Sequence, residues 1–381
     1  MRRTTTTTNA TMTSSSTGHG PQFERVTAAV ETIMTRHHIP GMSLAITSPD
    51  RVLFAAGFGH ADLATGAPAT ESTQYLWFSL TKIATATAAM RLFDLGTLDL
   101  NRPVSDFVPS YRPGKGASPT VRQLLSHTAG AASPIPVRWV RPAEQPAPQP
   151  RQFLDALLAR HGTPKYPVGG AARYSNLGYL MLAEVIAQAA GQPFTDYVTD
   201  AVLRPLKMAH TGFGYLPNRD AAVGYVRAPR IATPLLRLLL PKGIVGQRVG
   251  RYTSLNRFLV NGAGYGGIVG NVTDAARLAA MHLADGTLDG HSVLRPDTAR
   301  MMRNIAAPGK PFDVGLGWFR KPAARNTTAV EHLGAGGGFY NAMRLYPDLG
   351  LGIVAMANTT TAYDHAALFD TLARLDWHDQ S

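Results

Sequence analysis

The chain has 381 residues, of which 45% are hydrophobic and none is cysteine. Such a chain can bury a large core as one domain or two joined lobes, and the lack of cysteine excludes disulfides, thiolate metal sites and a cysteine nucleophile. The formal net charge of +12 comes with 30 arginines and only 7 lysines, which indicates a generally arginine-rich surface, and we expect no nucleic-acid partner.

The first 20 residues, MRRTTTTTNATMTSSSTGHG, are polar and include two arginines. No apolar stretch follows them, so they match neither a secretory nor a twin-arginine signal. No apolar run in the chain approaches the roughly 20 residues of a membrane span. We expect residues 1–20 to be a disordered tail and the protein to be cytoplasmic.

Two strand-like runs, 41–47 (GMSLAIT) and 52–59 (VLFAAGFG), are joined by the turn-rich tetrapeptide SPDR, which predicts a hairpin. Residues 78–96, FSLTKIATATAAMRLFDLG, come next. Their apolar side chains recur at helical spacing, and Gly96 stands where a C-terminal cap belongs. This segment is predicted to be an amphipathic helix.

The centre of the chain is predicted to be mostly helical or irregular. Thr120 and Gln123 have the spacing of a capping box, and the residues after Tyr174 form a further helix with one apolar face. Strand signals return in VEHL, GFYNAMRLYP and LGIVAMANT, between residues 330 and 359, and a last helix follows. This order predicts an α+β fold, with one antiparallel sheet built from the N- and C-terminal segments, flanking helices and an inserted, mostly helical lobe.

Several common catalytic and cofactor motifs are absent or misplaced. The chain has no Gly-x-Ser-x-Gly and no His-Glu-x-x-His, and its twelve histidines show no metal-ligand spacing. GAGYGG at 262–267 matches a dinucleotide-binding pattern, but the next helix is expected only near Thr273, too far along the chain to hold a phosphate. We therefore expect no metal and no organic cofactor.

Ser79 and Lys82 open the helix predicted at 78–96. At 3.6 residues per turn they lie one turn apart on one face, so the lysine amine can reach the serine hydroxyl as a base. Arginine could not do this, because it does not deprotonate in a protein. The alternative is a serine cap and a solvated surface charge.

Two further segments carry the same ambiguity. In RYSNLGYL, either Ser175 or Asn176 caps a helix, or Tyr174 is a phenol with a pKa lowered by Lys82 and Asn176 binds substrate. In HLGAGGGF at 332–339, the glycines are either a flexible link or part of a strand. Such a strand would accept a substrate backbone and supply an oxyanion-hole N–H.

Taken in order, Ser-x-x-Lys, Tyr-x-Asn and His-x-Gly resemble the penicillin-binding protein and class C β-lactamase superfamily, which includes serine esterases and D-amino-acid peptidases. The resemblance runs from about Gly41 to Asn358, and LLSHTAG, GYGGIVGNVTDAARLAAMHL and GLGW support it. It implies a β-lactamase/transpeptidase-like fold with a single catalytic domain over 21–381. The α/β region would cover about 21–105 and 265–381, and the helical region about 106–264.

The resemblance also implies roles. Ser79 is the acylated nucleophile, Lys82 its base, and Tyr174 shares proton transfer with Lys82. Substrate-binding roles are implied for Asn176, which would hold the acyl amide, and for His332 and Gly334. The oxyanion hole is expected from the backbone N–H groups of Ser79 and Ala335. The base for deacylation and the oligomeric state are not predicted.

His332 and Leu333 depart from the family pattern. A permanently charged lysine usually stands where this chain has His332, which is largely neutral near pH 7, and Leu333 replaces a hydroxyl residue. Both changes weaken recognition of a substrate carboxylate. They favour a carboxylesterase acting on apolar or amphiphilic esters, with a β-lactamase or a D-amino-acid or D-Ala peptidase as the alternative. A non-catalytic binding member of the fold is a third reading.

A basic, leucine-rich segment remains outside these motifs. Between residues 219 and 257 the chain has eight basic residues and one acid, Asp220, a local net charge of +7. Residues 231–249 within it begin with the apolar run IATPLLRLLLPKGIV. Basic and apolar side chains together favour a lid or a peripheral membrane contact, and the alternative is an ordinary packed insertion.

Overall fold

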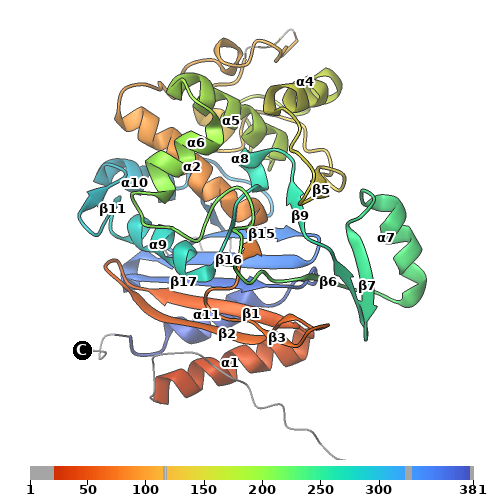
Figure 1. Ribbon diagram of the computed structural model, residues 1–381. Helices are drawn as coiled ribbons and strands as arrows, with labels where there is room; N and C mark the ends of the chain where they lie inside the picture. Colours follow the sequence, from red (N-terminus) through yellow and green to blue (C-terminus); the bar gives the residue numbers. More distant parts are fainter. Residues whose placement is uncertain (1–20, 115, 117, 322–327, 378–381) are drawn as a thin grey trace, which may run out of the picture.

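The computed structural model describes residues 21–114, 116, 118–321 and 328–377, so the tail predicted at 1–20 lies outside the described residues. Its largest element is an eight-stranded antiparallel sheet in the order β13-β14-β15-β16-β17-β1-β2-β3 (Figure 1). The strands are β1 (Gly41–Thr47), β2 (Val52–Asp62), β3 (Ala67–Pro68), β13 (Asp313–Val314), β14 (Phe319–Arg320), β15 (Val330–Gly336), β16 (Phe339–Tyr346) and β17 (Leu351–Ala357).

The two ends of the chain meet in the middle of this sheet. β1 pairs with β2 on one side and with β17 on the other, and Leu44 lies opposite Ala355 in the second pairing. Every residue of β1 and β17 is buried, as expected for central strands covered on both faces. The predicted hairpin and the predicted sheet of N- and C-terminal segments are confirmed.

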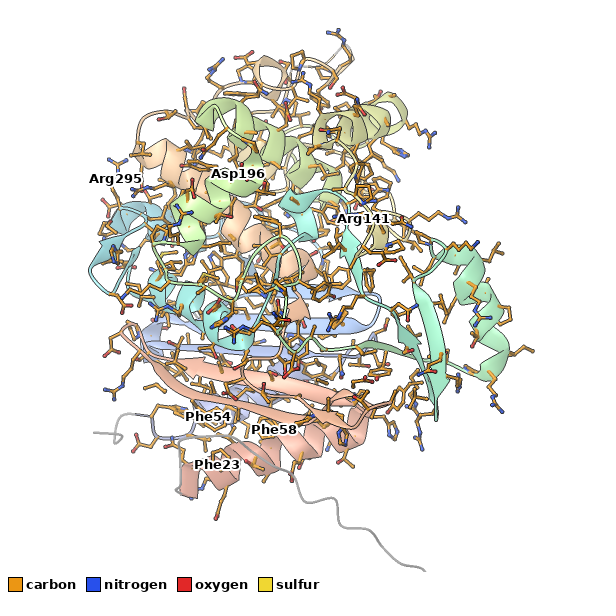
Figure 2. The ribbon with its side chains drawn as sticks, viewed as in Figure 1. Phe23, Phe54, Phe58, Arg141, Asp196 and Arg295 are labelled. Carbon is orange, nitrogen blue, oxygen red and sulfur yellow. The ribbon has the colours of Figure 1, made fainter. Side chains whose placement is uncertain are left out.

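Helices cover both faces of the sheet (Figure 1). On one face lie α1 (Pro21–His37) and α11 (His365–Ala373), packed through a core that includes Val26, Val30 and Phe369. Figure 2 shows Phe23 of α1 beside Phe54 of β2, with ring centroids 5.6 Å apart. On the other face lie α2 (Thr81–Asp94) and α9 (Val272–Leu283).

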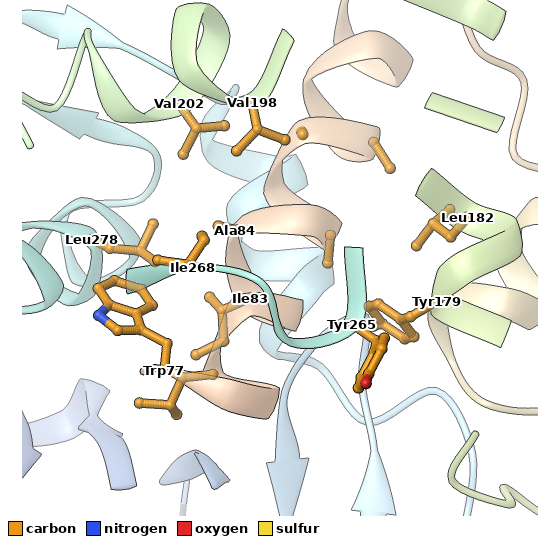
Figure 3. Packing of buried hydrophobic residues seen from close by; sticks show 14 of the residues in the cluster. Trp77, Ile83, Ala84, Tyr179, Leu182, Val198, Val202, Tyr265, Ile268 and Leu278 are labelled. Carbon is orange, nitrogen blue, oxygen red and sulfur yellow. The ribbon is translucent and has the colours of Figure 1, made fainter. Parts of the chain in front are cut away.

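The inserted lobe packs against α2. Its helices are α3 (Val121–Leu125), α4 (Pro150–His161), α5 (Asn176–Ala190), α6 (Phe194–Val198) and α8 (Ala263–Gly266). Figure 3 shows Ile83 and Ala84 of α2 in the core with Leu182 of α5, Val198 of α6 and Ile268. α2 is therefore held between the sheet and the lobe, and most of its side chains are buried.

Local capping follows the sequence closely in this lobe. The capping box of Thr120 and Gln123 is present at α3, and Ser175 caps α5 by accepting a hydrogen bond from the Gly178 N–H. Gly96 has a φ of 71° directly after the end of α2, as predicted for a C-terminal cap. The Ser175 cap fixes the start of α5, between Tyr174 and Asn176.

The lobe also contains strands that the sequence patterns did not indicate. They are β5 (Val140–Pro142), β6 (Gly224–Arg227), β7 (Val245–Val249), β8 (Tyr252–Leu255) and β9 (Phe258–Val260). β6, β8 and β7 form a three-stranded sheet, and α7 (Thr233–Leu239) lies outside it at the periphery of the molecule (Figure 1). The remaining short elements are β4 (Tyr75–Leu76), β10 (Val269–Gly270), β11 (Thr287–Leu288), β12 (His291–Ser292) and α10 (Pro296–Arg303).

Within the described ranges, none of the helices combines the length and the apolar character that a membrane crossing requires.

Candidate active site

The sequence pattern predicted that Ser79 lies at the start of an α-helix, and the structure differs. Residues Phe78–Leu80 form a 3₁₀ turn, η1, and α2 begins only at Thr81. Among the described residues, no side chain caps the N-terminus of η1 or of α2 by a hydrogen bond. Phe78 has a φ of 47°, in the left-handed region that costs a non-glycine residue on the order of 1 kcal/mol. Ser79 is thus presented on a tight, strained turn and caps no helix.

Two glycines of β15 allow this turn to lie directly against the sheet. A Cβ atom on Gly334 would come within 2.1 Å of the Trp77 carbonyl oxygen, and one on Gly336 within 2.1 Å of the Phe78 ring. The main-chain contact leaves no room for a side chain at position 334, and a side chain at position 336 would displace the Phe78 ring. Both residues lie inside β15, which rules out the alternative of a flexible link for this half of the motif.

Lys82 is completely buried and occupies the centre of the site. Its Nζ lies 3.1 Å from Ser79 Oγ, 2.8 Å from Asn176 Oδ1 and 2.8 Å from the Tyr265 carbonyl oxygen. Three tyrosine rings surround Nζ, with centroids at 4.8 to 5.4 Å: Tyr174, Tyr179 and Tyr265. The alternative of a solvated surface charge at Lys82 is excluded.

The surroundings of Lys82 favour a neutral amine. The three oxygens around Nζ belong to a hydroxyl, an amide and a main-chain carbonyl, so no carboxylate there compensates an ammonium charge. Burial lowers the pKa of Lys82 well below its ordinary value. A neutral amine has two N–H groups and one lone pair; Asn176 and Tyr265 can accept the two hydrogens, which leaves the lone pair for the Ser79 hydroxyl.

Tyr174 completes the contacts of the serine. Its hydroxyl donates a hydrogen bond to Ser79 Oγ at 2.6 Å. The expectation that Lys82 lowers the pKa of Tyr174 is wrong in direction. Desolvation of the partly buried ring raises that pKa, and a neutral Lys82 offers no positive charge to oppose the effect. Tyr174 is a neutral phenol that can both donate and accept a proton, and it is not a phenolate base.

His332 lies on β15 and is almost fully buried. Its Nδ1 is 2.8 Å from the carbonyl oxygen of Leu333, and its ring stacks on Phe319 with centroids 4.2 Å apart. Burial lowers the pKa of His332 to about 3. The imidazole is therefore neutral at ordinary pH and supplies no fixed positive charge for a substrate carboxylate.

The residues predicted to contact substrate lie close to Ser79 and Lys82. Asn176 is buried and its Oδ1 is engaged by Lys82, so only its amide N–H groups are left to offer to an acyl group. Ala335 is exposed, between Gly334 and Gly336 on β15. The structure thus brings Ser79, Lys82, Tyr174 and Asn176 into one hydrogen-bonded cluster and places the His332–Ala335 strand beside it.

Two members of the site were missed by the motif analysis, although both lie in segments that supported the family resemblance. Tyr265, in GYGG, provides the carbonyl that accepts from Lys82. His127, in LLSHTAG, accepts a hydrogen bond from the Ser175 N–H through Nδ1, and its ring lies 4.7 Å from that of Tyr174. Main-chain contacts and ring packing leave no spacing rule in a sequence, so only the family pattern could have indicated them.

The pocket is chemically suited to acyl transfer. It combines a hydroxyl, a buried amine, a phenol and a carboxamide, which are the groups that activate a serine without a metal. No group of three or more histidine, aspartate or glutamate side chains placed to bind a metal ion occurs among residues 21–114, 116, 118–321 and 328–377. Fold and hydrogen-bonded cluster together match the Ser-x-x-Lys arrangement that the sequence resemblance implied.

Comparison with known sequences identifies the family. The sequence model of the Beta-lactamase family matches residues 26–375, and the chain belongs to this family. Among curated relatives, Protein flp of Staphylococcus aureus (strain N315) is 30% identical over 208 residues, which cover 53% of this chain and 41% of flp. The D-alanyl-D-alanine-carboxypeptidase/endopeptidase AmpH of Escherichia coli (strain K12) is 27% identical over 72% of this chain and 68% of AmpH.

Solved structures confirm the β-lactamase/transpeptidase-like fold. The D-amino acid amidase of Ochrobactrum anthropi SV3 superposes with a TM-score of 0.75 at 21% identity, covering 92% of this chain and 97% of the amidase. EstCE1, described as a hydrolase with promiscuous acyltransferase activity, superposes with a TM-score of 0.71 at 23% identity, covering 92% and 98%. At these identities the likeness establishes the fold alone, and the chain spans less than half the length of the flp proteins.

Proposed function

We propose that this protein is a serine hydrolase that forms an acyl-enzyme on Ser79 and acts as a carboxylesterase on apolar or amphiphilic esters. The observation that carries the proposal is the set of contacts of Lys82. A buried amine with two hydrogen-bond acceptors and the serine hydroxyl around it is a base held ready to accept the serine proton.

The reaction follows from these contacts. Ser79 Oγ attacks the ester carbonyl carbon while its proton passes to the lone pair of Lys82, which becomes an ammonium. The carbonyl oxygen becomes an oxyanion, for which we propose the N–H groups of Ser79 and Ala335 as donors. The tetrahedral intermediate collapses when the alkoxide leaves with a proton relayed from Lys82 through the Tyr174 hydroxyl. Water then hydrolyses the acyl-enzyme and restores the Ser79 hydroxyl.

The preference for esters rests on the charge and polarity of the third motif. His332 is neutral and its ring stacks on Phe319, which stacks in turn on Phe312, so the third motif is backed by aromatic rings and carries no charge. A substrate carboxylate would find no cation in the third motif, whereas an uncharged acyl or alkyl group needs none. EstCE1, which has the same fold, is described as a hydrolase with promiscuous acyltransferase activity.

A peptidase or amidase acting on D-amino acids is the second candidate. β14 pairs with β15 at Glu331, and between the described residues no pairing with β14 extends to the glycine half of β15. That half can therefore receive an extended peptide backbone. AmpH is named as a D-alanyl-D-alanine-carboxypeptidase/endopeptidase, and the Ochrobactrum protein as a D-amino acid amidase.

An activity panel separates these candidates. It comprises p-nitrophenyl esters of increasing acyl length, nitrocefin and D-amino-acid amides, each tested with the wild type and with Ser79→Ala. We expect the esters to be the best substrates and Ser79→Ala to lose both turnover and labelling by a fluorophosphonate. Faster cleavage of the amides or nitrocefin would replace the esterase assignment. Ester turnover that persists in Ser79→Ala would overturn the mechanism, and no acylation by any activated ester would indicate a binding protein.

A further inference from the structure

Exposed apolar side chains are concentrated on one face of the lobe. Of the eight large hydrophobic residues exposed among the described residues, only Leu95 and Leu349 lie elsewhere. The other six form what we call the apolar patch: Ile135, Val137, Ile231, Leu235, Leu238 and Leu239. Ile231 is 88% exposed and Ile135 is 81% exposed, values that a packed insertion would not show. The sequence alternative of an ordinary packed insertion is therefore wrong for α7.

The two segments of the apolar patch are joined in space. Arg138, next to Val137, donates a hydrogen bond from Nη2 to the carbonyl oxygen of Leu238 at 2.8 Å. Ile231, Leu235 and Leu238 are spaced by four and three residues, so they lie along one side of the segment formed by the 3₁₀ turn η4 (Arg230–Ala232) and α7. No residue of α7 is buried, and the helix lies at the periphery of the molecule with Leu235, Leu238 and Leu239 exposed (Figure 2).

Positive charge surrounds the apolar patch. Between residues 219 and 257 eight basic residues stand against Asp220 alone. Those exposed to solvent include Arg227, Arg230, Arg237, Lys242 and Arg251, and Arg138 adds a further cation at the edge of the patch. Within the described part of the chain, none of the ion pairs involves a basic residue of this segment. These charges are thus available to an anionic partner.

We propose that the apolar patch and its basic rim dock the protein reversibly on an anionic phospholipid bilayer. Leucine and isoleucine side chains would enter the boundary between headgroups and acyl chains, while arginine and lysine remain at the phosphates. A second copy of this chain fits less well, because two faces that each carry an excess of positive charge repel one another. The charge complementarity therefore selects an anionic lipid surface as the occupant.

The docking face is connected to the catalytic pocket by a short chain of contacts. Trp139 follows the Ile135–Arg138 loop, and its ring lies 5.6 Å from that of Tyr265, whose carbonyl oxygen accepts from Lys82. If the proposed esterase function holds, this arrangement suits substrates that reside in a membrane. Bilayer docking itself does not depend on that function, because it rests on the exposed side chains alone.

Vesicle co-sedimentation of the full chain tests the proposal. We expect the wild type to pellet with phosphatidylcholine vesicles that contain phosphatidylglycerol, and to be released by high salt, which screens the basic rim. For the double variant Leu235→Ser/Leu238→Ser and for the charge reversal Arg230→Glu/Arg237→Glu, we expect vesicle affinity to fall about tenfold or by a larger factor. The matched control Leu95→Ser/Leu349→Ser removes two exposed leucines elsewhere and should bind as the wild type does.

Three outcomes would overturn the proposal. One is equal partition of the wild type and both patch variants, and another is a control variant that loses as much binding as the patch variants. The third is a wild type that stays in the supernatant and sediments as a dimer, which Leu235→Ser/Leu238→Ser converts to a monomer; this would assign the patch to a second copy. Circular dichroism melts of all variants ensure that only folded proteins are compared.

Discussion

Two basic regions of this molecule have opposite surroundings. Lys82 is completely buried, contacts only neutral oxygens and has a pKa well below its ordinary value. The segment at 219–257 carries eight basic residues on and around an outlying sheet and helix, and most of them are exposed to solvent. Burial makes the first region a candidate base with no net charge, whereas exposure keeps the second permanently cationic.

The difference explains why the two regions use different residues. A lysine can lose its proton when it is desolvated, but an arginine cannot, so only lysine can serve as a base in the pocket. On the surface arginine can replace lysine at no energetic cost, because the charge of either side chain stays in water. In a chain with 30 arginines and 7 lysines, the lysine at position 82 is therefore the informative one.

The largest loss of activity is expected for Lys82→Arg, because this substitution places a permanent cation beside Ser79. We expect kcat/KM for an activated ester to fall about 10³- to 10⁴-fold, since a guanidinium cannot accept the serine proton. Lys82→Met should lose as much and serves as the uncharged control. Stopped-flow acylation measures the effect, and an arginine variant that keeps most of the wild-type rate would contradict a neutral base.

Tyr174→Phe distinguishes the role of the Tyr174 hydroxyl from that of the Lys82 amine. The phenol hydroxyl donates to Ser79 Oγ but is not the base, so its removal should lower kcat/KM by about 10²-fold, less than removal of Lys82. The aromatic ring remains against His127 and Phe319, so the melting temperature should change little. Steady-state kinetics with calorimetry provides the check, and a loss as large as that of Lys82→Arg would make Tyr174 the principal base.

The buried imidazole of His332 is expected to make the stability of the protein depend on pH. The pKa of His332 in the folded protein is lowered to about 3, so the unfolded chain takes up a proton near pH 6.5 that the folded chain does not. The contribution of His332 to the free energy of unfolding is therefore fully present above pH 6.5 and is lost as the pH drops toward 3. From pH 7 to pH 5 the contribution of His332 should fall by about 2 kcal/mol.

Urea melts at several pH values test this sign. His332→Gln should flatten the dependence of unfolding free energy on pH, whatever its effect at pH 7. His291→Gln, at an exposed position on β12, is the matched control. A slope in His332→Gln equal to that of the wild type would show that His332 is not held neutral by the fold.

The smallest effect is expected at the apolar patch. Because no residue of α7 is buried, Leu235→Ser/Leu238→Ser should change the free energy of unfolding by less than about 0.5 kcal/mol. Hydrolysis of a short, water-soluble ester should also be unchanged. Chemical denaturation and ester kinetics measure both quantities, and a loss of several kcal/mol would mean that α7 packs against the body of the protein in solution.

Much of the fold could be predicted from local patterns. The hairpin of β1 and β2, the strands β15 to β17 and the capping box of α3 each depend on neighbouring residues, and all are confirmed. The helix α1 and the sheet of β6, β7 and β8 were not predicted. The strands of that sheet are short and pair across loops, so their stability comes from contacts distant in sequence.

The site shows a similar limit. The motif order brought Ser79, Lys82, Tyr174 and Asn176 together correctly, although their catalytic roles remain predictions. The direction of the Tyr174 pKa was wrong, because a spacing pattern shows the proximity of a lysine but not its burial. The strained Phe78 and the carbonyl of Tyr265 depend on how η1, β15 and α8 pack, which no local pattern encodes.

The central claim is that Lys82 is a neutral amine in the resting protein. Carbon-13 labelling of the lysine Cε positions gives seven signals, and the one missing in Lys82→Met belongs to Lys82. We predict that this signal titrates far below the ordinary lysine pKa of about 10.4. A Lys82 signal that remains in the ammonium position up to pH 10 would contradict the account.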